Sequence, residues 1–282
     1  LTVAYDFADN VHAYATYATA FKTFGLNNNG LPLDANNQPA LSAATVKPED
    51  EKHIEIGLKT RPLPGLTANF TLYRTEIDDF QANVVNGQVG VLRGYLANAE
   101  KVRVQGAEFD GNWRVNDNLT FYGNAAWTDG EYLSFPDAPP PLELSGGSVP
   151  LAPGLGVGVF DASHTRLPGL SKWAGSFGGE WTQPASFGKR EGEFFIAADA
   201  SYRSDFSSSP TASSYLNIDA YTLINARAGF RGDDGWDVFV WGRNLADEEY
   251  FEILSAGGSS SGYYAGLPGD PRTYGVTLRG SF

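Results

Sequence analysis

The residue types that most often carry catalysis are scarce and scattered in this sequence. The chain has three histidines, His12, His53 and His164, and no cysteine. The lack of cysteine excludes disulfides, thiolate metal sites and cysteine nucleophiles. His164 lies beside Ser163 and Asp161, but a hydrolase triad is assembled from residues that a fold brings together, not from neighbours along the chain. A hydrolase is therefore a remote alternative, and we expect no enzyme activity.

The sequence also lacks the motifs of metal-binding and phosphate-binding loops. Acidic pairs occur at 78–79, 233–234 and 248–249, without the spaced oxygen ligands of a calcium loop. The glycine-rich stretches 154–158 and 257–262 contain no lysine, and neither precedes a predicted helix, as a phosphate-binding loop would. The sequence predicts solvated turns and loops at these places, with no metal and no cofactor.

Composition narrows the class of protein to two. The 282 residues include 20 Lys and Arg against 33 Asp and Glu, a net charge of −13, which argues against a nucleic-acid partner. Aromatic residues reach 13% and there are 33 glycines, a mixture typical of strands and tight turns. No apolar run of about 18 residues is present, and the first residues do not resemble a signal peptide. A soluble all-β domain and a β-barrel membrane protein remain.

The pattern of alternating polar and apolar residues predicts eleven strands. Most exceed the roughly 5–6 residues usual in soluble sheets and reach the about 9–11 residues that a tilted strand needs to cross a bilayer. The predicted strands are 1–8, 11–24, 49–61, 66–85, 93–115, 118–133, 166–184, 192–207, 219–231, 235–247 and 271–282.

The connections between these strands alternate between short and long. Short links are expected at 9–10, 62–65, 116–117, 184–191 and 232–234, and long loops at 25–48, 134–165, 208–218 and 248–270, with 86–92 as a brief exception. Outer-membrane barrels have this arrangement, because short turns lie on the periplasmic side and longer loops on the extracellular side. Nothing in the architecture of a soluble β-sandwich requires short and long connections to alternate.

Aromatic residues border the apolar face of three predicted strands, always eight residues apart. Eight tilted residues span about 20 Å, close to the apolar band of an outer-membrane barrel. We predict that these aromatics contact outer-membrane lipid at the two borders: Trp173 and Trp181, Phe194 and Tyr202, and Tyr274 and Phe282. The opposite, polar faces predict a lumen wall of His53, Glu55, Lys59, Lys172, Glu180, Asp199, Arg203, Arg227 and Arg279. Segment 236–243 is apolar on both faces, so its orientation stays open.

Five motifs in order resemble one family. The end of the chain reads Pro271-Arg-Thr-Tyr-Gly275 and closes with Phe282, and Asn244-Leu-Ala-Asp247 precedes Tyr250. Upstream are Ala20-Phe-Lys22, Lys47-Pro-Glu49 before Glu55-Ile-Gly-Leu-Lys59, and Asn98-Ala-Glu100 before Val104-Gln-Gly-Ala-Glu108. Together they resemble the C-terminal half of the barrel of a TonB-dependent outer-membrane receptor. Ala246 and Gly280 depart from the residues common in that family.

The resemblance implies an all-β fold, an antiparallel transmembrane barrel of about twenty-two strands of which these eleven are the second half. It implies a location in the outer membrane of a Gram-negative bacterium. The expected partners are the N-terminal half of the barrel, a plug domain, TonB acting through the plug, and the barrel-assembly machinery, which would read the strand ending in Phe282. The odd strand count and the lack of methionine agree with an expectation that the plug, the TonB-contacting segment and a signal peptide precede Leu1.

The implied function is active import of a scarce nutrient, such as a siderophore, a vitamin or a glycan. Aromatic loop residues are the candidates for ligand contact, namely Phe135, Phe251, Tyr263 and Tyr264. Two alternatives remain. A passive pore or a small standalone barrel would have no plug, and a soluble β-sandwich that binds carbohydrate would need no detergent.

Overall fold

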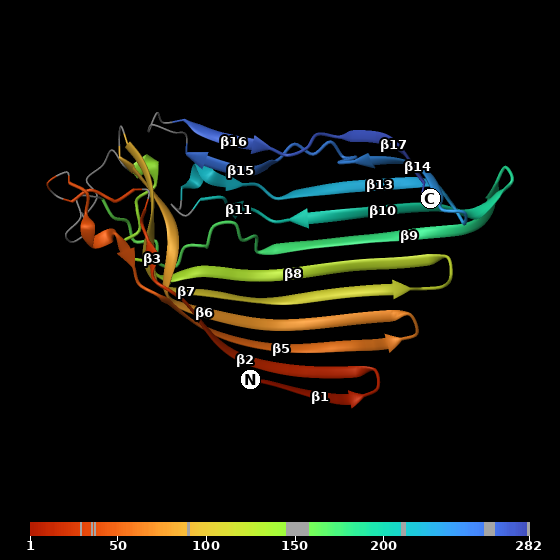
Figure 1. The fold of residues 1–282 in the computed structure, drawn as a ribbon, viewed down its shortest axis with the longest axis horizontal. Coiled ribbons are helices and arrows are strands. Elements are labelled where there is room, and N and C mark those ends of the chain that lie inside the picture. The colour runs from red at the N-terminus through yellow and green to blue at the C-terminus, as the bar shows by residue number, and fades with distance from the viewer. Residues whose placement is uncertain are drawn as a thin grey trace.

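The main feature of the computed structural model is one antiparallel sheet of eleven strands (Figure 1). The structure describes residues 1–28, 30–34, 36, 38–88, 91–144, 158–209, 213–256 and 263–280. The strands of the sheet are β1 (Thr2–Ala8), β2 (Val11–Lys22), β5 (Glu49–Leu63), β6 (Leu66–Gln88), β7 (Val91–Arg114), β8 (Leu119–Ser134), β9 (Trp173–Phe187), β10 (Arg190–Arg203), β13 (Tyr221–Gly232), β14 (Trp236–Arg243) and β17 (Thr273–Gly280). The predicted antiparallel all-β fold with eleven long strands is confirmed.

Each strand of the sheet pairs with the strands that precede and follow it, in the order β1-β2-β5-β6-β7-β8-β9-β10-β13-β14-β17. β1 and β17 are the two edges, so the sheet is open. Figure 1 shows the short turns at one end and the long connections at the other. The turn between β5 and β6 needs a glycine, because Gly65 has a φ of 75° and a Cβ there would lie 2.4 Å from the carbonyl oxygen of Arg114.

The long connections carry structure that the sequence pattern does not show. Segment 248–270, predicted as a loop, contains a hairpin of β15 (Phe251–Ala256) and β16 (Tyr264–Pro268). Two smaller pairs join β3 (Gly25–Leu26) to β4 (Thr45–Val46) and β11 (Phe206–Ser207) to β12 (Asn217–Ile218). Three short 3₁₀ helices complete the described parts of the loops: η1 (Leu41–Ala43), η2 (Leu142–Leu144) and η3 (Ser214–Leu216). None of the helices in the described ranges is long and apolar enough to cross a membrane.

The largest hydrophobic cluster lies at the loop end and not beneath the sheet. Its buried members come from β6, β7, β8 and the segment after β8: Ala82, Val84, Ala99, Val102, Tyr132, Phe135, Ala138, Ala162 and Leu167. The rings of Tyr132 and Phe135 lie 5.1 Å apart, and both side chains are 1% exposed. This cluster anchors the long connection after β8 on the β6–β7 hairpin.

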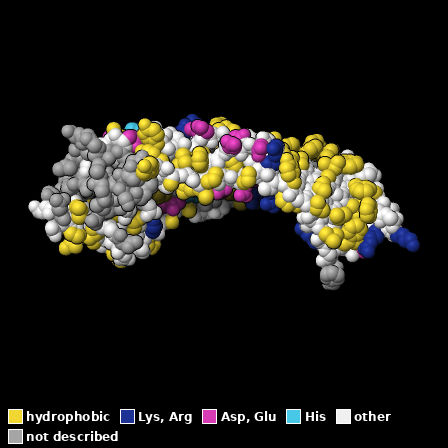
Figure 2. Space-filling view, turned by 90° about the horizontal axis from the view of Figure 1, so that it is seen from above, with side chains coloured by type: hydrophobic (Ala, Val, Ile, Leu, Met, Phe, Trp, Pro, Cys, Tyr) yellow, Lys and Arg dark blue, Asp and Glu magenta, His cyan; other side chains and the backbone are white. Residues whose placement is uncertain are grey.

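The middle of the sheet exposes apolar side chains on one face. Ile56 is 56% exposed, Leu72 60% and Val276 73%, although each lies in the centre of a regular strand. In Figure 2 hydrophobic side chains follow the arched sheet and gather over the end that carries the short turns. An apolar face of this extent on a soluble protein would favour aggregation. The wall of an outer-membrane barrel has such a face, because it places its apolar side chains outward.

Candidate functional site

The outward face carries the predicted border aromatics at both of its ends. Trp173 is 53% exposed and lies opposite Trp127 of β8, while Trp181 is 42% exposed at the turn end of the same strand. Phe194 and Tyr202 border β10, and Tyr274 lies at the loop end of β17, each also exposed. All five share the face of the apolar residues, whereas Phe282 lies outside the described residues. Their contact with lipid borders stays a prediction.

Strand pairing decides the orientation of β14, which the sequence pattern left open. Val238 lies opposite Leu278, and Val240 lies opposite Val276, so both valines belong to the outward, apolar side. Phe239 and Trp241 therefore point to the inner face. Two inward contacts hold them there: the Phe239 ring lies 6.0 Å from that of Phe195, and Trp241 Nε1 donates to Thr277 Oγ1 at 3.1 Å.

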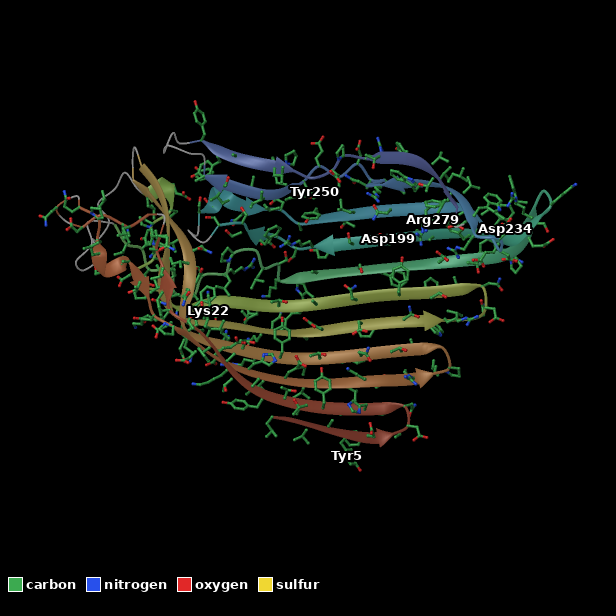
Figure 3. The ribbon with its side chains drawn as sticks, viewed as in Figure 1. Tyr5, Lys22, Asp199, Asp234, Tyr250 and Arg279 are labelled. Atoms are coloured by element: carbon green, nitrogen blue, oxygen red, sulfur yellow. The ribbon has the colours of Figure 1, made fainter. Side chains whose placement is uncertain are left out.

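The inner face is polar and its charges are largely paired. Glu180 accepts from both Arg227 at 3.1 Å and Arg231 at 3.3 Å, and Arg231 also bonds Glu193 at 2.6 Å. The carboxylate of Asp199, labelled in Figure 3, accepts from the Asn225 amide at 2.8 Å. Such a lining suits water or another polar surface inside a barrel.

Other predicted wall residues lie on the same face or at its loop-side border. His53 lies 2.8 Å from the Thr75 hydroxyl, and Glu55 accepts from the Tyr14 hydroxyl at 2.8 Å. Lys59 lies over the Tyr14 ring. Arg203 ends β10 and donates to Gly169 O and Ser171 Oγ, both at 2.7 Å. Arg279 is 70% exposed on β17, and Lys172 is exposed just before β9.

Three of the motifs that are far apart in the sequence meet at the loop end of β2, β5, β6 and β7. Lys22, labelled in Figure 3, donates to the Glu49 carboxylate at 3.0 Å. Glu49 also accepts from the backbone N–H of Gln81 at 2.7 Å. The side chain of Asn98 accepts from the N–H of Lys47 at 2.8 Å and donates to Asp79 O at 2.6 Å. These motif residues therefore fasten the loop entrance to the sheet.

The Asn244 motif and the Pro271-Arg272 motif form a second fastening, below the β15–β16 hairpin. Asn244 is 4% exposed, and its amide donates to Glu248 O at 2.9 Å and Asp270 O at 3.1 Å. The amide oxygen accepts from the N–H of Glu248 at 2.9 Å. Arg272 pairs with Asp247 at 3.0 Å. We call these five residues, Asn244, Asp247, Glu248, Asp270 and Arg272, the hairpin clamp.

Tyr250 extends the hairpin clamp with an aromatic contact (Figure 3). Its ring stacks on Tyr221 with centroids 4.4 Å apart and an interplanar angle of 28°. A Cβ on Gly269 would lie 2.0 Å from the Tyr250 ring, so only glycine fits there. The family motif in this part of the chain is thus structural, and it positions the loop that carries the candidate ligand residues.

The candidate ligand surface lies where three long connections meet. Glu143 accepts from Ser213 Oγ at 2.9 Å and from the Tyr264 hydroxyl at 3.3 Å. The ring of Tyr264 stacks on Tyr215 at 5.3 Å with an interplanar angle of 30°. Tyr215 is 63% exposed and Tyr263 75% exposed. We call Tyr215, Tyr263 and Tyr264 the tyrosine platform.

The electrostatics of the tyrosine platform keep its central phenol neutral. Burial, together with the nearby Glu143 carboxylate, raises the pKa of Tyr264 above its ordinary value. An ordinary tyrosine is already protonated at neutral pH, so the Tyr264 hydroxyl donates to Glu143, and the raised pKa extends this to higher pH. Tyr215 and Glu143 could not be predicted from the sequence, because a lone tyrosine and a lone glutamate in different loops give no spacing signal.

The other two predicted ligand residues differ in accessibility. Phe251 is 46% exposed and packs against the backbone of Gly266 in the β15–β16 hairpin. Phe135 is 1% exposed inside the loop-end cluster, so its side chain supports the loop and does not face solvent. Tyr263 and Tyr264 are neighbours in the sequence, and the structure adds Tyr215 as the stacking partner of Tyr264. Phe251 lies at the other end of the β15–β16 hairpin, opposite Pro268.

The Asp161, Ser163 and His164 group has a structural role in the loop. Ser163 Oγ accepts from the N–H of Phe135 at 2.9 Å, and the N–H of Ser163 donates to Asp161 at 2.9 Å. Hydrogen bonds from Ser163 lower the pKa of Asp161. Within the described parts of the chain, no three His, Asp or Glu side chains are placed to hold a metal ion.

An open antiparallel sheet with an apolar outer face and a charged inner face defines part of the wall of a transmembrane β-barrel. The model of the family "TonB dependent receptor-like, beta-barrel" matches residues 1–245. The chain therefore belongs to this family, and its place is the outer membrane of a Gram-negative bacterium.

Curated and solved relatives support the assignment. The chain is 25% identical over 282 residues to the ferric-pyoverdine M114 receptor PbuA of Pseudomonas sp. (strain M114), covering 99% of this chain and 29% of that protein. The ferric yersiniabactin uptake receptor FyuA from Yersinia pestis has a TM-score of 0.72 at 16% identity, with 100% of this chain and 36% of that chain covered. The ferric citrate transporter FecA has a TM-score of 0.66 at 18% identity, with 100% and 37% covered. The chain thus spans about a third of the length of these relatives.

Proposed function

We propose that this chain forms barrel wall and extracellular loops of a receptor that actively imports a scarce nutrient across the outer membrane. The observation that carries the proposal is the combination of a lipid-facing apolar surface, a charged inner surface and an exposed tyrosine platform at the loop end. Import would depend on TonB acting through a plug domain. Lipid on the outward face and the barrel-assembly machinery at the last strand are the further proposed partners.

The ligand we propose is a metal chelate with planar, aromatic or conjugated groups. The names of the relatives support a ferric chelate, because they describe a ferric-pyoverdine receptor, a ferric yersiniabactin uptake receptor and a ferric citrate transporter. The planar group is proposed from the stacked rings of Tyr215 and Tyr264. Stacked tyrosines bind planar groups through their faces, at about 0.5–1.5 kcal/mol for each aromatic contact beyond the buried area. The wall and loops would bind and conduct the ligand without changing it chemically.

The test is uptake of ⁵⁵Fe given as ferric pyoverdine to cells that produce the full-length receptor. We expect uptake that requires TonB, and a several-fold higher half-saturating concentration for Tyr215→Ala combined with Tyr264→Ala. Tyr17→Ala, which removes an exposed tyrosine from the lipid-facing side of β2, is the matched control and should leave uptake unchanged. Uptake that continues without TonB would instead indicate the passive pore.

A further inference from the structure

A cavity of about 510 Å³ lies on the inner face of the last strands of the sheet, away from the tyrosine platform. Three arginines and one aspartate line it, Arg227, Arg243, Arg279 and Asp199, a net charge of +2. The whole chain carries a net charge of −13, so this positive lining is a local concentration. Its volume falls in the range of small-molecule sites, about 300–1,000 Å³.

Two of these arginines retain donors that no carboxylate uses. Arg227 already shares Glu180 with Arg231. Arg279, in contrast, is 70% exposed, and its ion pair with Asp237 is 3.9 Å long, which is too long for a hydrogen bond. Arg243 has no carboxylate within ion-pair distance among the residues that the structure describes. Asp199 accepts from the Asn225 amide and forms no ion pair with either arginine among the residues that the structure describes. Figure 3 shows Asp199 and Arg279 on the same part of the sheet.

Aromatic side chains form the floor of the cavity and orient one of the free guanidinium groups. The Arg243 guanidinium lies 5.3 Å from the centre of the Trp241 ring. The Trp241 indole is held by its hydrogen bond to Thr277. Stacking on a ring leaves the N–H groups at the edge of a guanidinium free, and these can bind a carboxylate through two parallel hydrogen bonds. A carboxylate attached to a planar group would match both the free N–H groups of the guanidinium and the aromatic lining of the cavity.

We propose that this cavity is a binding site for carboxylate-type anions on the inner wall, with Arg243 and Arg279 as the binding residues. The site does not depend on the tyrosine platform, and it rests on the proposed function only in that the inner face would border the path of a transported ligand. The anion has two possible sources of the same chemistry: a carboxylate on a ligand, or an acidic side chain from another part of the full-length protein.

The experiment uses the purified full-length receptor in detergent and benzene-1,3,5-tricarboxylate as the probe, with its uncharged triamide for comparison. Binding is measured by isothermal titration calorimetry. The test variant is Arg243→Gln combined with Arg279→Gln, and the control is Arg61→Gln combined with Lys189→Gln, which removes the same charge at the end of the sheet that carries the short turns. We expect the wild type and the control to prefer the tricarboxylate, and the test variant to bind it at least about tenfold more weakly.

The unfolding temperature distinguishes the two sources of the anion. If an acidic side chain of the protein occupies the site, the probe will not bind the wild type, and the test variant will unfold at a lower temperature than the control. The proposal is overturned if the triamide binds as well as the tricarboxylate, if both variants bind the probe equally, or if no probe binds and both variants unfold at the same temperature. None of these measurements requires energised cells, so a failure of TonB-dependent uptake would be seen separately.

Discussion

Removing the Asn244 side chain should release the β15–β16 hairpin from the sheet. The buried amide makes three hydrogen bonds to backbone groups of Glu248 and Asp270. At about 1 kcal/mol for each bond, Asn244→Ala loses about 3 kcal/mol of local stability. Asn244 also has a φ of 49°, a left-handed conformation that costs alanine about 1 kcal/mol more. The expected total is about 4 kcal/mol.

Two further substitutions separate the hydrogen bonds from the backbone strain. Asn244→Gly avoids the strain but loses the bonds, so we expect a loss of about 3 kcal/mol. Asn244→Asp keeps the acceptor for the Glu248 N–H but places a buried carboxylate oxygen against the carbonyl oxygens of Glu248 and Asp270, so we expect a larger loss than for alanine. The predicted order of destabilisation is therefore aspartate, then alanine, then glycine.

Amide hydrogen exchange of residues 251–256 and 264–268 measures this local opening directly. The expected loss of about 4 kcal/mol for Asn244→Ala corresponds to exchange that is nearly a thousandfold faster, and the loss of about 3 kcal/mol for Asn244→Gly to exchange that is about a hundredfold faster. Asn118→Ala is the control, because Asn118 likewise donates to a backbone carbonyl, that of Thr182 at 2.7 Å, but at the opposite end of the sheet. Hairpin amides that exchange equally fast in Asn244→Ala and in the wild type would refute the reasoning.

Three other predictions test the faces of the wall and the loop packing. Leu72→Arg places a charge on the outward, apolar face and should lower the free energy of unfolding, measured by refolding into lipid vesicles, by about 2–4 kcal/mol. Thr71→Arg, on the inner face, should lower it much less. Equal losses for the two variants would contradict the assignment of the faces. Phe135→Ala should destabilise the loop-end cluster by about 3–5 kcal/mol, seen as faster proteolysis of the connection after β8, and an unchanged cleavage rate would count against this packing. The pKa of Asp161 is lowered in the folded loop, so the stability that its carboxylate gives the loop is present above the ordinary pKa of 3.8 and is lost as the pH falls through the folded value. The hydrogen-exchange rate of the Ser163 amide, corrected for the intrinsic rate, should therefore rise below about pH 4. A corrected rate that does not change with pH would contradict this prediction.

Local patterns in the sequence were enough to predict the eleven strands and the alternation of short and long connections. A strand exposes alternate residues to opposite faces, so one strand such as β17 shows its lipid-facing side without knowledge of its neighbours. The motifs near the end of the chain, at 244–247 and 271–275, could also be identified from the sequence, because the residues of each motif lie close together along the chain. For the same reason the border aromatics Trp173 and Trp181 could be placed on one face before the structure was known.

The tertiary structure decided what depends on contacts between distant segments. β14 has apolar residues on both sides, so only its pairing with β17 shows that Val240 faces lipid and Trp241 faces inward. The hairpin clamp, the tyrosine platform and the arginine-lined cavity each combine residues from separate parts of the chain. Phe135 looked like an accessible loop residue but is buried against Tyr132. Alternation along a strand is a local property, whereas register and loop packing depend on which segments meet in space.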